Sequence, residues 1–246
     1  MSVFLPALYR NVTDIANFAT MSDKKYIPLS ERILYEDNHI IVINKLAGEI
    51  VQGDKTGDIP LSETLKDFIR ERDNKPGNVF IGVPHRLDRP VSGLCVFAKT
   101  SKALERLNVM FSKGEMHKTY LALVAVRPEE DEAVLTHYLT RNEKQNKTYA
   151  WPSPRPEAKE ARLRYKYLRS TKSYHLIEIE LYTGRHHQIR CQLAAIGLPI
   201  KGDLKYGAPR SNPDGGISLH AYHLEFEHPV RKEPVSITAP WEPWAP

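Results

Sequence analysis

The chain has 246 residues, of which 41% are hydrophobic, enough for a packed core and too many for wholesale disorder. Its formal net charge of +5 is compatible with a polyanionic partner without requiring one. Cys95 and Cys191 both lie in apolar runs, which indicates reduced core residues and not a disulfide framework.

Nothing in the sequence indicates a membrane or a secretory protein. No apolar run approaches the roughly 20 residues that cross a bilayer. The stretch 2–8 has no basic region before it and is interrupted at Pro6, so it does not resemble a secretory signal. We therefore expect a cytoplasmic protein. Residues 1–30 are expected to form a tail or small appendage, and residues 31–246 a single domain.

The first half of the domain alternates between buried strands and amphipathic helices. A β-branched run at 40–43 predicts a strand, and apolar residues at helical spacing predict a helix over 61–74. Residues 94–98 predict a second buried strand. The next helix shares one apolar face over 104–111, and Gly114 is well placed to end it.

The second half is dominated by strand signals. There is no strict alternation of strand and helix, so a doubly wound parallel sheet is disfavoured. We expect one α+β domain on a large mixed, mainly antiparallel sheet flanked by helices. The predicted strands are 120–126, 134–139, 162–169, 174–182, 218–226 and 235–238, with a loop over 201–216 and a helix from about Arg185 to Gly197 that buries Ile189, Leu193 and Ile196.

The run HRLDRPVSGLCVFAKT at 85–100 places one acid among cations in a short turn. Asp88 lies between Arg86 and Arg89 and is expected to stay ionised, which suits a nucleophile or an anchor better than a proton donor. Gly93 lets the backbone turn before the apolar strand. The alternative interpretation is an ordinary structural ion pair in an Arg-rich turn.

Two further segments are expected to converge on Asp88. One is HKTY at 117–120, in which an aromatic residue enters a strand behind basic residues, although Tyr120 alone could simply fill the core. The other is TGRHHQIR at 183–190, where Thr183 can cap a helix whose first turn is basic. That placement opposes the helix dipole, so an anionic partner is expected there.

Some side chains leave two interpretations open. His186 and His187, with His220 and His223, suggest a metal site, but adjacent helical histidines point apart and no cysteine or carboxylate cluster completes one, so we expect no metal. The alternating cations Arg162, Arg164 and Lys166 could track phosphates or form a solvated face, with Tyr165 and Tyr167 on the opposite face. Arg190 alone could be an ordinary surface cation.

Together, HRLD followed by SG and an apolar strand, then TGR-HQIR, then PI-GD-Y resemble the signature of the RluA-type pseudouridine synthases. The resemblance extends from about Ile33 to the C-terminus. It implies a mixed-sheet catalytic domain with a central RNA-binding cleft, and isomerisation of particular uridines in rRNA or tRNA. It also implies a reaction without cofactor or metal. A monomer is expected.

The resemblance assigns roles to individual residues. It implies that Asp88 is the catalytic aspartate, that Arg190 pairs with it, and that Tyr120 stacks on the target uracil and can serve as a base. Ile189 would lie beside the base, and Arg86 would fill the gap left by the flipped uridine. The further residues expected at the substrate are His85, Arg185, His187 and Gln188.

The sequence departs from the family pattern at one position, where Leu46 follows Lys45 in place of the usual proline. No S4-type RNA-binding module is recognised before residue 33. Two other functions stay open: an RNA-binding module of the same fold without catalysis, and a metal-dependent phosphoesterase that uses Asp88 with the histidines.

Overall fold

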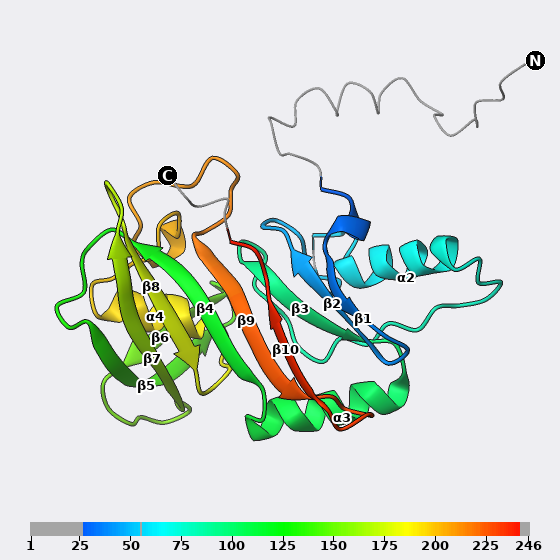
Figure 1. Cartoon of the computed structure of the whole chain (residues 1–246). Helices are drawn as coiled ribbons and strands as arrows, with labels where there is room; N and C mark the ends of the chain where they lie inside the picture. Colours follow the sequence, from blue (N-terminus) through cyan, green and yellow to red (C-terminus); the bar gives the residue numbers. More distant parts are fainter. Residues whose placement is uncertain (1–26, 55, 242–246) are drawn as a thin grey trace, which may run out of the picture.

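The computed structural model describes residues 27–54 and 56–241 (Figure 1). Within these ranges the chain forms ten strands, three α-helices and two short 3-10 turns. In chain order they are η1 (Leu29–Glu31), β1 (Ile33–Glu36), β2 (Ile40–Lys45), α2 (Leu61–Arg72), β3 (Ser92–Ala98), α3 (Ser101–Lys113), β4 (His117–Val124), β5 (Glu132–Asn142), β6 (Lys147–Trp151), β7 (Lys159–Ser170), β8 (His175–Leu181), α4 (Gln188–Ala195), η2 (Leu204–Tyr206), β9 (Leu219–Glu227) and β10 (Pro234–Thr238).

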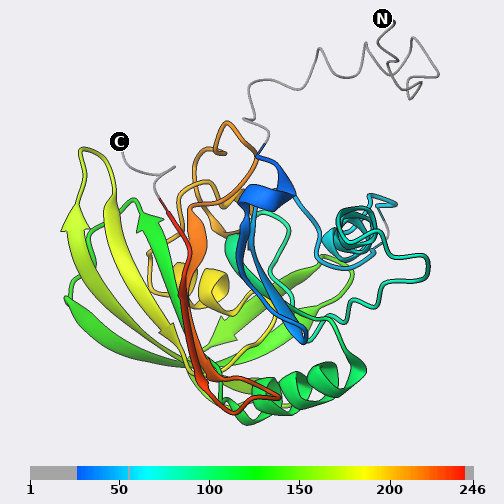
Figure 2. The ribbon, with the colours of Figure 1, turned by 45° about the vertical axis from the view of Figure 1, so that its right-hand side comes forward.

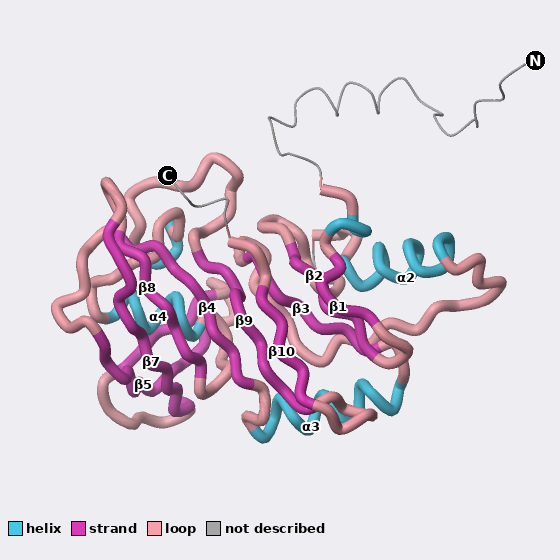
Figure 3. The backbone as a smooth tube through the Cα atoms, in the orientation of Figure 1, coloured by secondary structure: helices cyan, strands magenta, loops and turns pink. Residues whose placement is uncertain are grey.

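All ten strands belong to one sheet in the order β1-β2-β3-β9-β4-β8-β7-β5-β6, with β10 paired to β9. The pairing of β3 with β9 is parallel, and the other pairings are antiparallel. This confirms the predicted mixed, mainly antiparallel sheet. Figure 3 shows the strands as the body of the molecule, with α3 across one end of β9 and β10.

The helices α2 and α3 confirm the predictions made for the first half of the domain. Their apolar faces bury Leu65, Ile69 and Leu107 in the same core as the strand residues 40–43. Thr100 caps α3 by accepting the N–H of Ala103 at 3.2 Å. The helix ends at Gly114, whose positive φ of 75° is the conformation that favours glycine.

The predicted start of α4 is wrong. The helix begins at Gln188 and not near Arg185, because the chain turns over residues 183–187. Thr183 does not cap it, since its hydroxyl donates to the side-chain oxygen of Gln188 at 2.8 Å. Ile189 and Leu193 are buried as predicted, but Ile196 is 38% exposed because the helix has already ended.

Strands β1 and β6 are absent from the sequence prediction. Most residues of β6 are exposed or half-buried, so it lacks the apolar alternation that reveals a strand. The tail predicted for residues 1–30 falls mostly outside the described residues, although Leu29 already packs into the core. No helix in the described part of the chain is long and apolar enough to cross a membrane.

Figure 2 shows how the sheet curves around α4. The helix packs Cys191 and Ala194 against β5, β6 and β7 through Leu139, Ala150 and Ala161. Farther along the sheet, β3 pairs with β9, and Gly93 lies opposite Ala221. This contact joins the half of the sheet that carries the Asp88 turn to the half that carries Tyr120.

Gly93 is required at that junction for two reasons. Its φ is +110°, and a Cβ atom at this position would lie 2.3 Å from the carbonyl oxygen of Ala221. We expect Gly93→Ala to lower the free energy of unfolding by about 3 kcal/mol, through backbone strain and overpacking. Thermal unfolding should show this as a melting temperature lower by about 6–12 °C.

Gly53→Ala is the matched control, because Gly53 is exposed, has no positive φ and would place its Cβ atom in open space. Its stability should stay within about 0.5 kcal/mol of the parent protein. Equal melting temperatures for the two variants would show that the β3–β9 junction does not depend on close backbone approach.

Candidate active site

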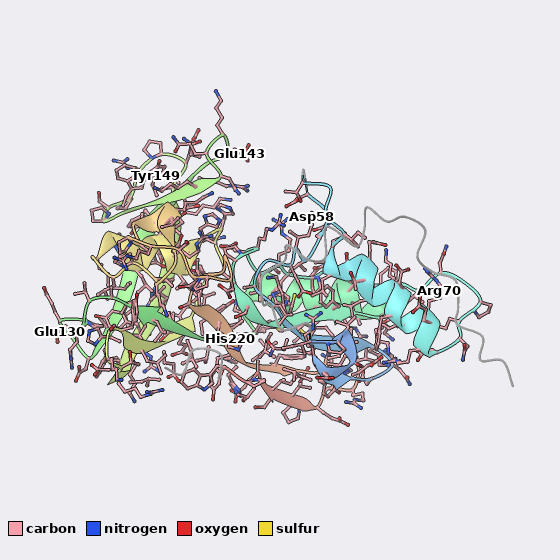
Figure 4. The ribbon with its side chains drawn as sticks, turned by 90° about the horizontal axis from the view of Figure 1, so that it is seen from above. Asp58, Arg70, Glu130, Glu143, Tyr149 and His220 are labelled. Carbon is pink, nitrogen blue, oxygen red and sulfur yellow. The ribbon has the colours of Figure 1, made fainter. Side chains whose placement is uncertain are left out.

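A cleft of about 720 Å³ lies where the Asp88 turn, β4 and the start of α4 meet. Seen from above, Glu143 and Tyr149 of β5–β6 and Asp58 of the β2–α2 loop project on the same side of the sheet (Figure 4). The three sequence segments predicted to converge all line this cleft. The residues concerned are His85, Arg86, Asp88, Tyr120, Arg185, His187, Gln188, Ile189 and Arg190.

Lys45, at the end of β2, holds the Asp88 turn from the protein interior, and its side chain has no solvent exposure. Its ammonium group donates to the carbonyl oxygens of Leu46 at 3.0 Å, Asp88 at 3.4 Å, Arg89 at 3.2 Å and Val91 at 2.6 Å. Burial lowers the pKa of Lys45 to about 8. One buried cation thus ties four carbonyl groups together, and three of them, those of Leu46, Asp88 and Arg89, also accept a backbone N–H.

Leu46 has its own role beside that lysine. Its backbone N–H donates to the Glu49 carboxylate at 2.8 Å, and the same carboxylate oxygen pairs with Arg32 at 2.8 Å. Proline has no N–H and could not make the first of these bonds. The departure from the family pattern at Leu46 is therefore accommodated by a hydrogen bond to a neighbouring ion pair.

Arg190, on the first turn of α4, bridges two carboxylates. Its Nε and Nη2 atoms donate to Asp203 at 2.6 and 2.9 Å, and its Nη1 atom donates to Asp88 at 2.9 Å. The Arg190 side chain is 6% exposed and that of Asp203 is 1% exposed. Burial alone would lower the pKa of Arg190, but the two acids outweigh it and raise that pKa. The guanidinium is a fixed cation with its donors already aimed.

The arginines next to Asp88 in sequence are not its partners. Arg89 pairs with Asp58 at 2.6 Å, and Arg86 is exposed at the cleft without an ion pair among the described residues. The cation that holds Asp88 comes instead from position 190, 102 residues away in sequence. Among the residues that the structure describes, the two cationic or imidazole contacts of the carboxylate both go to Oδ2, from Arg190 at 2.9 Å and from His187 at 3.5 Å.

Tyr120 lies on β4 between β8 and β9 and is 8% exposed. Burial, and then the charge of Asp88, raise the pKa of its phenol, so the group is neutral at physiological pH. Ile189, from the first turn of α4, is 5% exposed and lines the same cleft. The cleft therefore has an aromatic wall and an aliphatic wall close to one carboxylate.

His85 and Gln188 line the cleft and bond to neighbouring backbone groups that form its walls. His85 accepts the backbone N–H of Val96 at 2.9 Å and stacks on Phe111 with ring centroids 4.4 Å apart. Burial lowers its pKa to about 3, so its ring is neutral. The Gln188 amide accepts from Thr183 and from the N–H of Arg185, and donates to the carbonyl of Arg162 at 3.1 Å.

Further cations line the cleft, of which Lys118 belongs to the predicted HKTY segment, whereas Lys113 and Arg141 were missed by sequence reasoning. Lys113 and Lys118 approach it from α3 and β4, and Arg141 approaches from β5. Burial lowers the pKa of Lys118, which lies over the Phe111 ring at 5.8 Å. Together with Arg86 and Arg185, these side chains make a positive rim that suits a polyanion.

The structure bears on two questions that the sequence left open, the role of the alternating cations on β7 and the possibility of a metal site. Arg164 pairs with Glu132 and Glu180, both at 3.0 Å, and none of the alternating cations of β7 lines the cleft. Tyr165 is buried on the other face of β7, as predicted. No group of three histidine, cysteine or acidic side chains among residues 27–54 and 56–241 is arranged to hold a metal ion.

Comparisons with known proteins identify the family of this chain. A family model described as RNA pseudouridylate synthase matches residues 39–195. The ribosomal large subunit pseudouridine synthase C of Vibrio parahaemolyticus is 31% identical over 224 residues, covering 89% of this chain and 68% of that protein. The ribosomal large subunit pseudouridine synthase D of Xylella fastidiosa is 36% identical over 234 residues, covering 87% of this chain and 66% of that protein.

The alignment with a third relative covers similar shares of both chains. The tRNA pseudouridine synthase C of Yersinia pestis is 32% identical over 236 residues, covering 86% of this chain and 87% of that protein. The chain spans about two thirds of the length of the two ribosomal relatives. All three relatives are named as enzymes, which supports an enzyme over an inactive module.

Solved structures share the fold. Human RNA pseudouridylate synthase domain containing 4 aligns with a TM-score of 0.70 at 24% identity, covering 86% of this chain and 89% of that one. Human RNA pseudouridylate synthase domain containing 1 aligns with a TM-score of 0.66 at 24% identity, covering 87% and 84%. With a family model that covers more than half of its residues and relatives above 30% identity, this chain belongs to the RNA pseudouridylate synthases, the family that its three motifs predicted.

Proposed function

We propose that the chain isomerises particular uridines to pseudouridine in a ribosomal or transfer RNA, with Asp88 as the nucleophile. The observation that carries this proposal is the Arg190 bridge, which holds Asp88 at 2.9 Å in a cleft lined by Tyr120 and Ile189. Residues 31–246 act as one catalytic domain, and the protein acts as a monomer.

The reaction needs a group that attaches to the nucleotide and later departs. The bond between ribose C1′ and uracil N1 breaks, the uracil turns, and C1′ joins to C5. The C5 proton is lost and N1 gains one, so the product is an isomer. The Asp88 carboxylate can form the temporary bond either at C1′ or at the uracil ring. Either route returns the carboxylate unchanged at the end.

The two oxygens of Asp88 have different surroundings. Oδ2 receives Arg190 and faces His187, whereas Oδ1 has no protein partner among the described residues. The free oxygen is therefore the one that attacks. Arg190 cannot move toward it without giving up its two bonds to buried Asp203, so the geometry of the nucleophile is set before RNA arrives.

The walls of the cleft suit a nucleotide flipped out of its stack. Flipping costs a few kcal/mol, and an aromatic platform returns on the order of 1–3 kcal/mol per stacked base. Tyr120 provides that platform opposite Ile189, and exposed Arg86 fills the space the uridine leaves. Arg185 and the rim cations receive the phosphates.

Asp88→Asn should abolish isomerisation while RNA binding persists, because the amide keeps the shape of the carboxylate without its nucleophilicity. Pseudouridine mapping on total rRNA and tRNA, together with salt-dependent RNA affinity, measures both. The control is Asp67→Asn, a similarly paired acid on α2 that lies 2.7 Å from Arg70 and outside the cleft. Identical maps for parent and Asp88→Asn protein would contradict the proposal.

Arg190→Lys should lower the single-turnover rate by at least about 100-fold, because an ammonium group cannot reach Asp88 and bind Asp203 in two places at once. Arg164→Lys is a matched control, since Arg164 also bridges two carboxylates but lies outside the cleft. Circular dichroism checks that both variants are folded. A fully active Arg190→Lys protein would show that the pairing is not needed.

Tyr120→Phe should keep RNA affinity, because the stacking ring remains, and should slow turnover, because the hydroxyl is lost. The phenol has a raised pKa beside Asp88, so as a neutral group it can pass a proton between substrate and carboxylate. Dissociation constants and single-turnover rates separate the two effects. If affinity and rate fell by the same factor, Tyr120 would only position the base.

A further inference from the structure

His187 has an unusual backbone conformation and a nearly buried side chain. It immediately precedes α4 with a φ of +51°, a region that non-glycine residues rarely occupy. Its side chain is 6% exposed and stacks on His186 with ring centroids 3.8 Å apart. A strained conformation of this kind persists where surrounding contacts hold it, often at functional sites.

The contacts of Tyr206 determine which imidazole nitrogen carries the hydrogen. The Tyr206 hydroxyl oxygen accepts the backbone N–H of Thr148 at 2.9 Å and lies 2.8 Å from Nδ1 of His187. In the described part of the chain this hydroxyl has no other acceptor for its own proton. Donation of this proton to Nδ1 pairs both groups, and it corresponds to a neutral ring that carries its hydrogen on Nε2.

The neutral state of His187 is consistent with its surroundings. Burial lowers its pKa to about 3, with the charges of Arg190 and Lys205 and neighbouring His186 acting in the same direction, against Asp88. A neutral ring with one N–H can donate to Asp88 without handing it a proton.

Thr148 on strand β6 contacts both Tyr206 and His186, the two side chains that flank His187. Besides its bond to Tyr206, Thr148 bonds through its hydroxyl to Nδ1 of His186 at 2.7 Å, and Asn146 lies 3.1 Å from the other nitrogen of that ring. Thr148 is 3% exposed, so both bonds are shielded from water. One strand residue therefore fixes Tyr206 and the ring on which His187 is stacked.

The remaining nitrogen of His187 faces the nucleophile. Nε2 lies 3.5 Å from Oδ2 of Asp88, the same oxygen that Arg190 holds at 2.9 Å. A shift of about 0.4 Å would bring this contact into hydrogen-bond range. Arg190 and His187 would then both donate to Oδ2 of Asp88 and leave Oδ1 free.

Resting on the proposed function, we propose that His187 is a positioning residue. Its Nε2–H, with the tautomer set by Thr148 and Tyr206, holds Oδ2 of Asp88 so that Oδ1 faces the nucleotide. The role differs from the substrate contact expected from the sequence, since Nδ1 is bonded to Tyr206 and Nε2 points at Asp88 from 3.5 Å. No proton transfer from the ring is involved.

The chain allows a matched pair of variants at this position. The amide nitrogen of glutamine can occupy the place of Nε2 and restore the donor to Asp88. Asparagine is shorter and can accept from Tyr206 but cannot reach Asp88. Both are compared with the parent full-length protein in single-turnover assays on an RNA that it modifies, with RNA dissociation constants and melting temperatures measured alongside.

His187→Asn should lower the single-turnover rate by about 10- to 100-fold, the loss of one hydrogen bond to a charged group, with RNA affinity unchanged. His187→Gln should recover most of that loss. Equal rates for parent and His187→Asn, or equal losses in both variants, would overturn the role. A loss that follows RNA affinity and not rate would return His187 to substrate contact and also overturn it.

The tautomer provides a second test that does not depend on activity. Long-range ¹H–¹⁵N NMR of the parent protein at neutral pH should show His187 as a neutral ring protonated at Nε2. Tyr206→Phe should shift that ring toward the Nδ1–H form. A ring that is charged or protonated at Nδ1 in the parent would overturn the inference. A parent protein with the expected tautomer but no isomerase activity would instead overturn the proposed function.

Discussion

The site depends on one buried guanidinium shared between two carboxylates. Arg190 has almost no access to water, and its three donating nitrogens reach Asp203 and Asp88. A buried cation is costly unless paired, and leaving either acid alone would be costly too. Asp203 therefore fixes Arg190, and Arg190 fixes Asp88. Asp88, the proposed nucleophile, is therefore held by a series of ion pairs that begins at Asp203, on the loop after α4, and not by the arginines next to it in sequence.

The fold places these ion pairs at the cleft by bringing segments together that are distant in sequence. Gly93 lets β3 lie against β9, so that the Asp88 turn reaches the edge of β4 and Tyr120. Lys45 holds the carbonyl groups of the turn from inside the core. The arrangement uses polar groups in the core where most of the protein uses aliphatic ones. We infer that rigidity of the turn is what these buried polar contacts provide, since partly satisfied networks would destabilise it.

Local patterns predicted those parts of the molecule whose residues carry their own signal. The apolar faces of α2 and α3, the end of α3 at Gly114 and the buried strands at 40–43 and 94–98 followed from periodicity and capping. Strand β6 did not, because most of its residues are half-buried without apolar alternation and its place is set by pairing with β5. The start of α4 was misplaced because the hydroxyl of Thr183 binds Gln188 in place of the helix end. Family motifs brought Asp88, Tyr120 and Arg190 together, but the roles of Asp203 and Lys45 required the three-dimensional contacts.

The central claim is that Arg190 keeps Asp88 aimed while a flipped uridine occupies the cleft. A crystal structure of the Asp88→Asn protein bound to a uridine-containing RNA that the parent modifies tests it most directly. The account predicts one uridine out of its stack between Tyr120 and Ile189, with Arg190 still within hydrogen-bond distance of both position 88 and Asp203. A uridine that stays stacked in the RNA, or an Arg190 turned away to a phosphate, would contradict it.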